Sequence, residues 1–381
     1  MRRISTLALY PGLEVARPVF NKSGQALLKS GTRLTERFIG RLKTMGIPAI
    51  YVEDGLFPDI EVEDVISEET RSAAVGLVKN LVGDQVNELG GVVKKAIILN
   101  KDLTNTISNI VDQLMMYRNV MVNLFDIRTF DEYTFNHSVN VCVLSVLTGI
   151  ALGYSRDRLS VLAMGSLLHD LGKTQVPREI LNKPSELTEE EFGQVKKHCQ
   201  LGFEIIKNSN ITDIVAASIS LQHHERYDGQ GYPNQLKEKK IHEFSRVVGI
   251  VDTYDAVTSH RVFRRAIPPH EAYEFISGAG GHLFDYEITK AFLSHIPAYP
   301  VGTIVVLNTN EVGAVVENIR GYSRFPKVRI LFDPYGKYIT NFKEVWLARD
   351  TGYFIVRTVE DVRDAFQDRS KVNLLDFLPG R

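Results

Sequence analysis

Two apolar, helix-forming stretches of this chain end in clusters of histidine and acidic residues, where a folded protein normally continues its hydrophobic core. One cluster is His169-Asp170-Leu171-Gly172-Lys173, and the other runs from His223-His224-Glu225 to Asp228-Gly229-Gln230-Gly231-Tyr232-Pro233. Burying imidazole and carboxylate groups costs free energy unless each group finds a partner, and a divalent metal ion satisfies several of them at once. The chain is therefore predicted to fold around a metal site.

Composition sets mild limits on the rest of the molecule. The chain has 381 residues, of which 44% are hydrophobic and 24% are charged. Single hydrophobic cores rarely exceed about 250–300 residues, so we expect a globular protein of several domains. The formal net charge of -1 gives no sign of binding to polymeric nucleic acid or to a membrane, so an anionic ligand requires a local basic cluster.

The sequence contains no apolar run of about 18 residues, the length that spans a bilayer, and no apolar segment of a signal peptide follows Met1-Arg2-Arg3. We therefore expect a cytoplasmic protein without membrane insertion. The two cysteines, Cys142 and Cys199, are too few for a disulfide framework. Both are predicted to be buried structural thiols.

Residues 1–56 are predicted to form a small α+β domain. A β-type stretch over residues 13–20 returns through residues 25–28 after a turn. Thr35 can cap a following helix, and residues 49–52 are typical of a further strand.

The remaining chain is predicted to have three parts. Residues 57–125 form a helical connector, whose long helices can pair with each other or with a second copy of the chain in a homodimer. Residues 126–297 are helical and contain every candidate ligand, whereas residues 298–381 form a small β-rich module with short β-type runs and a tail after Asp350 that has no clear pattern. The expected fold class is mainly α, a helical bundle flanked by a small N-terminal α+β unit and a small C-terminal β module.

Helical spacing turns the candidate ligands toward buried faces, because residues three or four apart share one side of a helix. Three sets follow this spacing: Tyr133, His137, Val141 and Leu144; Val215, Ile219 and His223; Val248, Asp252 and Ala256. On two further helices, His198 follows Val195 by three residues, and His169 and Asp170 follow the apolar run of residues 161–168. A single histidine on an apolar face is more often a hydrogen-bonded core residue than a ligand. Five helices that all turn imidazole or carboxylate inward are hard to satisfy by hydrogen bonds alone, and this favours a metal.

The types of ligand narrow the chemistry. Imidazole and carboxylate without thiolate suit Fe, Mn, Zn, Co or Ni better than a soft metal or calcium. The adjacent His169 and Asp170 can serve two ions, with the short carboxylate as the bridge. Two metal ions about 3.5–4 Å apart form a clamp suited to phosphoester hydrolysis, so a phosphodiesterase is favoured.

At these residues the chain resembles the HD-GYP domain proteins, a subgroup of the HD superfamily of metal-dependent phosphohydrolases. Both defining motifs are complete, and the downstream run of the family also matches at Ile241, Arg246, Asp252, Asp255-Ala256, Thr258-Ser259 and Arg261 to Arg264. The resemblance covers about residues 126–295. It implies a helical bundle around a two- or three-metal centre that hydrolyses cyclic di-GMP by attack of a metal-bridging hydroxide, with a linear dinucleotide or GMP as the end product.

The resemblance also implies the metal ligands, with Asp170 as the bridge: His137, His169, Asp170, His198, His223, His224 and Asp252. Family members with a third metal carry Glu four residues before the first ligand histidine. Here that place is Tyr133, with Glu132 one step away. We therefore expect two divalent metal ions, with Fe or Mn favoured over Zn, Co or Ni.

Other roles follow from the same resemblance. Lys173 is expected beside the attacked phosphate or the leaving oxygen, and with Asp170 it is the predicted catalytic residue. Arg261 and Arg264 are assigned to the substrate phosphates, a role that suits the paired donors of guanidinium. The substrate is also expected to meet the signature loop, at Gly229, Gly231 and Tyr232, and this loop or the N-terminal domain can bind a partner protein.

Several alternatives stay open at this level. The chain could be a cyclic-dinucleotide receptor or signalling adaptor, or an HD phosphohydrolase acting on another nucleotide. The complete ligand set favours an enzyme, and the intact Gly231-Tyr232-Pro233 favours a cyclic dinucleotide. Glu225 either orients an imidazole or caps the following loop, and Lys196-Lys197 is predicted to be a solvated helix face. Five further histidines are expected to lie outside the ligand set: His242, His260, His270, His282 and His295.

Overall fold

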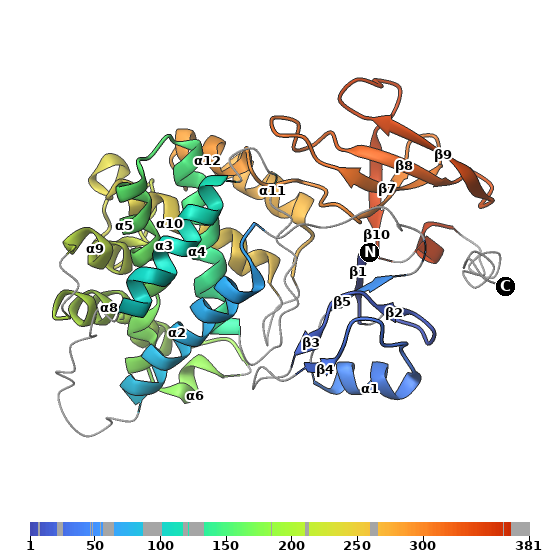
Figure 1. Cartoon of the computed structure of the whole chain (residues 1–381). Coiled ribbons are helices and arrows are strands. Elements are labelled where there is room, and N and C mark those ends of the chain that lie inside the picture. The colour runs from blue at the N-terminus through green and yellow to red at the C-terminus, as the bar shows by residue number, and fades with distance from the viewer. Residues whose placement is uncertain are drawn as a thin grey trace. The chain divides into compact units, whose positions relative to one another are not determined.

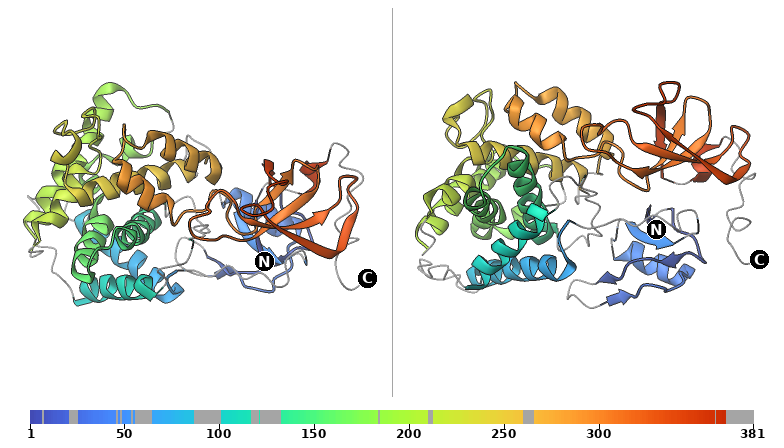
Figure 2. Two further views of the ribbon diagram at one scale, coloured as in Figure 1. Left: turned by 90° about the horizontal axis from the view of Figure 1, so that it is seen from above. Right: turned by 45° about the horizontal axis from the view of Figure 1, so that its top comes forward.

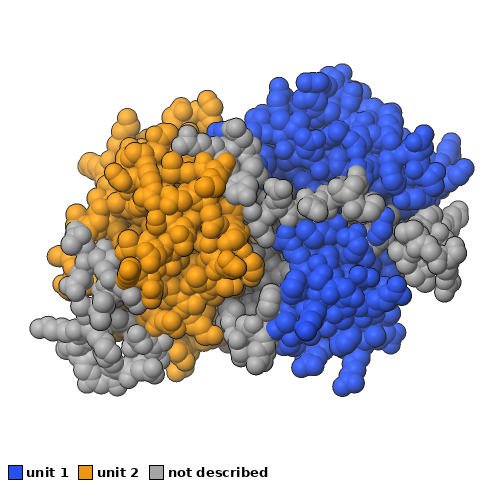
Figure 3. Space-filling model, in the orientation of Figure 1, with its two compact units in different colours: residues 1–64, 121–133, 297–381 blue, residues 65–120, 134–296 orange. Residues whose placement is uncertain are grey.

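The computed structural model describes residues 1–6, 8–20, 26–45, 47, 49–53, 55, 65–86, 101–116, 121, 133–183, 185–209, 213–259, 266–360 and 362–366. The chain divides into two compact units (Figure 3). One comprises residues 1–64, 121–133 and 297–381, and the other comprises residues 65–120 and 134–296. The predicted fold class is confirmed, and the four-part domain division stays a prediction.

The N-terminal segment forms a small α+β region around one hydrophobic cluster. Its elements are β1 (Arg2–Ser5), β2 (Glu14–Val15), β3 (Val19–Phe20), β4 (Ala26–Leu28), α1 (Glu36–Thr44) and β5 (Ala49–Glu53). Strand β5 lies between β1 and β2 in an antiparallel sheet, and β3 pairs with β4. Helix α1 begins after Thr35, whose side chain accepts a hydrogen bond from the backbone N–H of Phe38, as the sequence predicts.

The C-terminal segment, coloured orange to red in Figure 2, is a β-sheet. The sheet is antiparallel with five strands, in the order β10-β6-β7-β8-β9. The strands are β6 (Ile304–Leu307), β7 (Val312–Glu317), β8 (Lys327–Phe332), β9 (Tyr338–Trp346) and β10 (Ile355–Val359), followed by the 3-10 helix η4 (Val362–Ala365). Ile304 and Val306 pack in one apolar cluster and Val305 and Leu307 in another, so both faces of the sheet are covered. Strand β10 lies after Asp350, where the sequence shows no clear pattern.

The second unit is helical (Figure 1), and every candidate metal ligand falls within its residues 134–296. Its helices are α2 (Glu68–Val86), α3 (Lys101–Met116), α4 (Tyr133–Ala151), α5 (Arg156–Leu168), α6 (Arg178–Leu181), α7 (Glu189–Lys196), α8 (His198–Lys207), α9 (Ile214–Gln222), α10 (Glu243–Thr258), α11 (Pro269–Ala279) and α12 (Tyr286–Leu293), with the 3-10 turns η2 (Leu171–Gln175) and η3 (Glu238–Lys240). Among the described residues, no helix has both the length and the apolar character needed to cross a membrane.

Helix α4 is the central element of this unit, because residues 137–149 are all buried. Helix α3 packs against α2 and α5, and α9 packs against α5, α8 and α10. Arg71 of α2 donates a hydrogen bond to the side-chain oxygen of Asn140 in α4, 3.2 Å away. The helices predicted as a connector, α2 and α3, therefore pack into the unit that holds the candidate ligands.

Candidate metal centre

Three of the candidate histidines lie where helices end, and a backbone carbonyl orients each ring. The last carbonyls of a helix lack intrahelical partners, and the Nδ1–H groups of these rings use them. His169 donates to Ser166 at the end of α5 (2.7 Å), His198 to Val195 at the end of α7 (2.5 Å), and His223 to Ser220 at the end of α9 (2.8 Å). Because a carbonyl only accepts, Nδ1 carries the hydrogen and Nε2 is free to bind a metal.

Three further candidate ligands come from two long helices and from the residue pair that ends α9. His137 lies in α4 and Asp252 in α10, and His137 Nε2 is 3.1 Å from Asp252 Oδ1. His224 follows His223 at the end of α9, with its Nδ1 3.8 Å from Asp252 Oδ2. The spacing argument that turned these residues inward is thus consistent with the burial of His137 and His223 at 2% exposure each.

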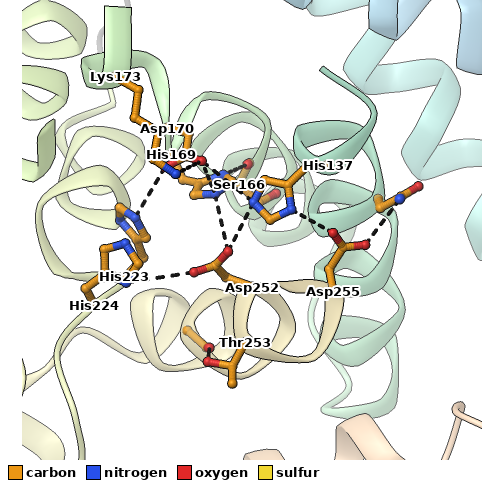
Figure 4. Close-up of polar contacts among 12 residues, drawn as sticks. His137, Ser166, His169, Asp170, Lys173, His223, His224, Asp252, Thr253 and Asp255 are labelled. Atoms are coloured by element: carbon orange, nitrogen blue, oxygen red, sulfur yellow. Dashed lines mark hydrogen bonds and ion pairs between the residues drawn. The ribbon is translucent and has the colours of Figure 1, made fainter. Parts of the chain in front are cut away.

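The side chains gather in two groups. One group contains His198, His223 and His224 together with Cys199, and the other contains His137, His169 and Asp170. Figure 4 shows His223 and His224 of the first group together with all three residues of the second. Asp170 Oδ1 lies 3.6 Å from His198 Nε2 and 3.8 Å from His223 Nε2. Its Oδ2 lies 3.5 Å from His169 Nε2 and 3.7 Å from His137 Nε2. One oxygen of Asp170 therefore faces each group.

Two buried polar atoms in this cluster lack a hydrogen-bond partner. Within the described ranges, these atoms are Nε2 of His169 and Oδ1 of Asp170. A buried polar atom without a partner costs free energy that a bound cation recovers. The ends of α5, α7 and α9 also point their partial negative charge at this place. The donor set and its surroundings therefore fit divalent cations.

The ionisation of the cluster favours cations as well. Burial opposes the charge on Asp170, but Lys173 and the neighbouring imidazoles hold the pKa of this carboxyl well below its usual range. The pKa of Asp252 is also well below its usual range. Burial raises this pKa, but the hydrogen bond and the charge of His137 lower it by more. Burial lowers the pKa of His198 to about 4 and that of His224 to about 3. At neutral pH the site thus offers two carboxylates and several neutral imidazoles.

His137 differs from His198 and His224 because its pKa is raised. Burial disfavours its charged form, but hydrogen bonds with Asp252 and Asp255 outweigh burial and raise the pKa of His137 to about 9. Its Nδ1 lies 2.7 Å from Asp255 Oδ2. Asp255 was not singled out as a site residue from the sequence, although it follows Asp252 by three residues on the same face of α10. That spacing was the signal that could have found it.

The glycine and lysine of the first motif have visible roles in the packing. A Cβ atom on Gly172 would lie 2.0 Å from the carbonyl oxygen of His198, so only glycine lets η2 approach α8 this closely. Lys173 Nζ donates to Asp170 Oδ2 at 2.6 Å, which places the predicted catalytic lysine on the carboxylate between the two groups.

Glu225 holds the signature loop, which resolves the alternatives left open by the sequence. Its carboxylate accepts hydrogen bonds from the backbone N–H groups of Asn234 at 2.7 Å and Leu236 at 2.9 Å. Gly231 packs against this anchor, because a Cβ there would lie 2.5 Å from the Cα of Glu225. Gly229 has a φ of +83°, a conformation that favours glycine.

The loop returns Tyr232 to the metal centre. Its ring stacks on the ring of His224, with centroids 4.8 Å apart and an interplanar angle of 29°. Tyr232 is therefore the loop residue that contacts a candidate ligand, through the face of its ring.

Cys199 is a buried thiol, as predicted, but its position was not foreseen. Its Sγ lies 3.6 Å from His198 Nε2, and burial raises the pKa of the thiol. Arg261 and Arg264, which the resemblance assigns to the substrate phosphates, lie outside the described residues, as do His260, Glu132 and the side chain of Tyr133.

Comparison with known proteins agrees with this site. Residues 136–288 match the family described as an HD domain, and residues 304–364 match a KOW domain associated with the HD domain. The chain is 34% identical over 234 residues to a cyclic di-GMP phosphodiesterase of Pseudomonas aeruginosa, covering 60% of this chain and 56% of that protein. It is also 34% identical over 206 residues to one of Thermotoga maritima, covering 54% of this chain and 55% of that protein.

The chain thus spans slightly more than half the length of these curated relatives. A solved structure of a HDG"Y"P protein from Bdellovibrio bacteriovorus aligns with 76% of this chain and 97% of its own, at 16% identity and a TM-score of 0.43. The helical fold, the cluster and the match agree that residues 136–288 form an HD domain. Within that domain, the paired motifs that end in Lys173 and Pro233 are the residues that resemble the HD-GYP group.

Proposed function

We propose that this chain is a metal-dependent phosphodiesterase that hydrolyses cyclic di-GMP. The observation that carries the proposal is the position of Asp170, whose two oxygens face two separate groups of imidazoles. This is the arrangement that a carboxylate bridging two metal ions requires. The names of the relatives from Pseudomonas aeruginosa and Thermotoga maritima support cyclic di-GMP as the substrate.

Two divalent ions would be held by the seven ligands expected from the sequence, with Asp170 shared between them. Bound there, they would supply positive charge at the phosphoryl oxygens and make hydroxide available near neutral pH. Fe or Mn is proposed first because the ligands are imidazole and carboxylate, with Zn, Co and Ni as alternatives.

The protein itself orients these groups and neutralises charge. Carbonyls at three helix ends hold the rings of His169, His198 and His223 in one tautomer. Lys173, next to Asp170, is proposed to stabilise the negative charge that develops at the phosphate or the leaving oxygen. Arg261 and Arg264 are proposed to bind the substrate phosphates, on the strength of the family resemblance alone.

The runner-up is a receptor that binds a cyclic dinucleotide without cleaving it. The complete donor set and the low pKa of both Asp170 and Asp252 favour the enzyme, since binding alone requires no such centre. The end product, a linear dinucleotide or GMP, and the preference among cyclic dinucleotides are open in this proposal. The homodimer and the protein partner stay predictions from the sequence.

The test combines metal analysis with turnover of cyclic di-GMP by anaerobically purified protein. We expect two metal ions per chain and conversion of cyclic di-GMP that can be followed by chromatography. Replacing both His169 and Asp170 by Ala should abolish metal binding and hydrolysis while circular dichroism keeps its helical signal. Undiminished metal content in this double variant would contradict the ligand assignment, and binding of the nucleotide without cleavage by the metal-loaded protein would favour the receptor.

A further inference from the structure

Helix α7 carries an exposed aromatic residue and a lysine that meet the signature loop. Phe192 is 42% exposed, and its ring meets the ring of Tyr232 edge-on at a centroid distance of 6.1 Å. The ammonium of Lys196, one helical turn later, lies 4.6 Å from the centroid of Phe192 and 5.4 Å from that of Tyr232. This lysine is therefore held between two rings, whereas the sequence predicted a merely solvated helix face.

This trio is continuous with the metal centre. Tyr232 stacks on His224, which belongs to one of the two ligand groups. The carbonyl of Val195, the residue before Lys196, accepts the Nδ1 hydrogen of His198. The end of α7 is thus fixed to one candidate ligand, and the ring that Lys196 contacts is fixed to another. A group bound at Phe192 and Lys196 would lie next to whatever the metals hold.

The chemistry of the trio suits the part of a nucleotide that is not cleaved. An exposed aromatic face stacks with a nucleobase, because every base has a π-face. An ammonium that rests on aromatic rings still has N–H groups to donate to a phosphate oxygen. A surface that offers both features within one helical turn matches a nucleotide better than it matches a simple phosphodiester.

We propose that Lys196 and Phe192 form an anchor for the far half of the cyclic dinucleotide, where Lys196 binds the uncleaved phosphate and Phe192 stacks on a guanine base. This inference rests on the proposed function and names the residues that make the centre selective for a dinucleotide. Neither residue takes part in the cleavage step, so both are positioning residues.

The experiment compares two substrates, cyclic di-GMP and bis(p-nitrophenyl) phosphate, a small diester without a base or a second phosphate. Lys196→Met and Phe192→Ala should each raise the Michaelis constant for cyclic di-GMP about tenfold, as expected for one lost charge-assisted or stacking contact, and leave kcat within about twofold. Turnover of the small diester should stay at the wild-type level. This turnover is the control that the metal centre is intact in each variant. Lys197→Met is the matched control, because Lys197 is the next lysine and is exposed.

An unchanged Michaelis constant in both variants, or an equal loss on both substrates, would overturn the anchor. Failure of the proposed function has a different signature, because the wild-type protein would then leave cyclic di-GMP intact. In that case, calorimetry measures how tightly the metal-loaded variants bind cyclic di-GMP, and this tests whether Lys196 and Phe192 form the anchor. Weaker binding of cyclic di-GMP by Lys196→Met than by Lys197→Met would support it, and equal binding would refute it.

Discussion

Nδ1 of His137 lies 2.7 Å from Oδ2 of Asp255, and this contact joins helix α4 to helix α10 beside the metal centre. Asp255 Oδ1 also accepts a hydrogen bond from the side chain of Asn140 at 3.2 Å. A carboxylate behind a ligand histidine fixes the tautomer of the ring and raises its basicity. Asp255 is therefore a positioning residue for the metal that His137 would bind.

Replacing Asp255 by Asn should weaken metal binding about 10- to 100-fold, the usual effect of losing such a partner. The amide keeps the shape of the side chain but removes the charge that orients His137. Competition with a chelator measures the affinity, and Asp157→Asn, an exposed position in the first turn of α5, serves as the control. Equal affinities in the two variants would show that Asp255 has only a packing role.

The raised pKa of His137 predicts how metal affinity depends on pH. With a pKa of about 9, metal-free His137 carries a proton at neutral pH, and a metal ion must displace it. Apparent affinity should therefore rise about tenfold per pH unit from neutral pH and level off above pH ~9. Calorimetry at pH ~7.5 in buffers of different ionisation enthalpy measures the proton release. Metal binding without proton release at that pH would show that His137 is already neutral.

The stability of the metal-free protein should depend on pH in two opposite ways. His198 and His224, with pKa values of about 4 and about 3, stay neutral in the fold while the unfolded chain takes up protons below pH ~6.5. The contribution of these two histidines to the free energy of unfolding is therefore present above pH ~6.5. It is lost as the pH falls from ~6.5 toward their pKa values in the fold. His137 contributes fully below pH ~6.5 and loses its contribution as the pH rises through about 9.

Urea denaturation of chelator-treated protein at several pH values tests this prediction. The His198→Asn, His224→Asn double variant should lose less stability than the wild type between pH ~6.5 and pH ~5. The same loss in both proteins would show that carboxylates elsewhere cause the acid sensitivity.

The sequence predicted that candidate ligands face the core because the periodicity within each helix is local. His137 in α4 and His223 at the end of α9 each lie three or four residues from apolar neighbours on their own helix. Both side chains are buried in the structure. The spacing places Asp255 on the same helix face as Asp252, but it does not reveal the partner of Asp255, His137, which lies 118 residues away in the sequence. In the C-terminal module the sequence predicted β-type runs at residues 303–307, 313–316 and 327–332, but not β9 or β10. Both are edge strands with many exposed residues, so they lack the apolar pattern of β6 or β8.

Glu225 illustrates a limit of the motif itself. The sequence left its role open because carboxylates near histidines serve both as ring partners and as loop caps. In the structure its oxygens accept hydrogen bonds from the N–H groups of Asn234 and Leu236, and burial raises the pKa of this carboxyl. Only the three-dimensional course of the loop could decide between the two roles.

Glu225→Gln should loosen the signature loop, because the amide nitrogen that replaces one carboxylate oxygen cannot accept the hydrogen bond of that oxygen. We expect trypsin to cleave after Arg226 or Lys237 about tenfold faster than in the wild type, as expected for the loss of one charge-assisted hydrogen bond. The Michaelis constant for cyclic di-GMP should rise in parallel, because Tyr232 loses its fixed place over His224. Metal content serves as the control and should not change, whereas unchanged cleavage would show that Gly231 packing alone holds the loop.

Replacing Lys173 tests the mechanism, because its contact with Asp170 is consistent with two roles: stabilising charge on the reacting phosphate, or positioning Asp170. Its Nζ donates to Oδ2 of Asp170, the oxygen that faces His137 and His169. If Lys173 stabilises charge on the reacting phosphate, Lys173→Met should lower kcat about 10²- to 10³-fold, comparable to the loss of one preorganised donor. Metal occupancy and the Michaelis constant should then change little. If Lys173 only positions Asp170, the same variant should lose metal first and recover turnover when metal is added in excess. Single-turnover cleavage with metal occupancy measured in parallel separates these cases, and full activity in a fully metallated variant would remove Lys173 from the reaction.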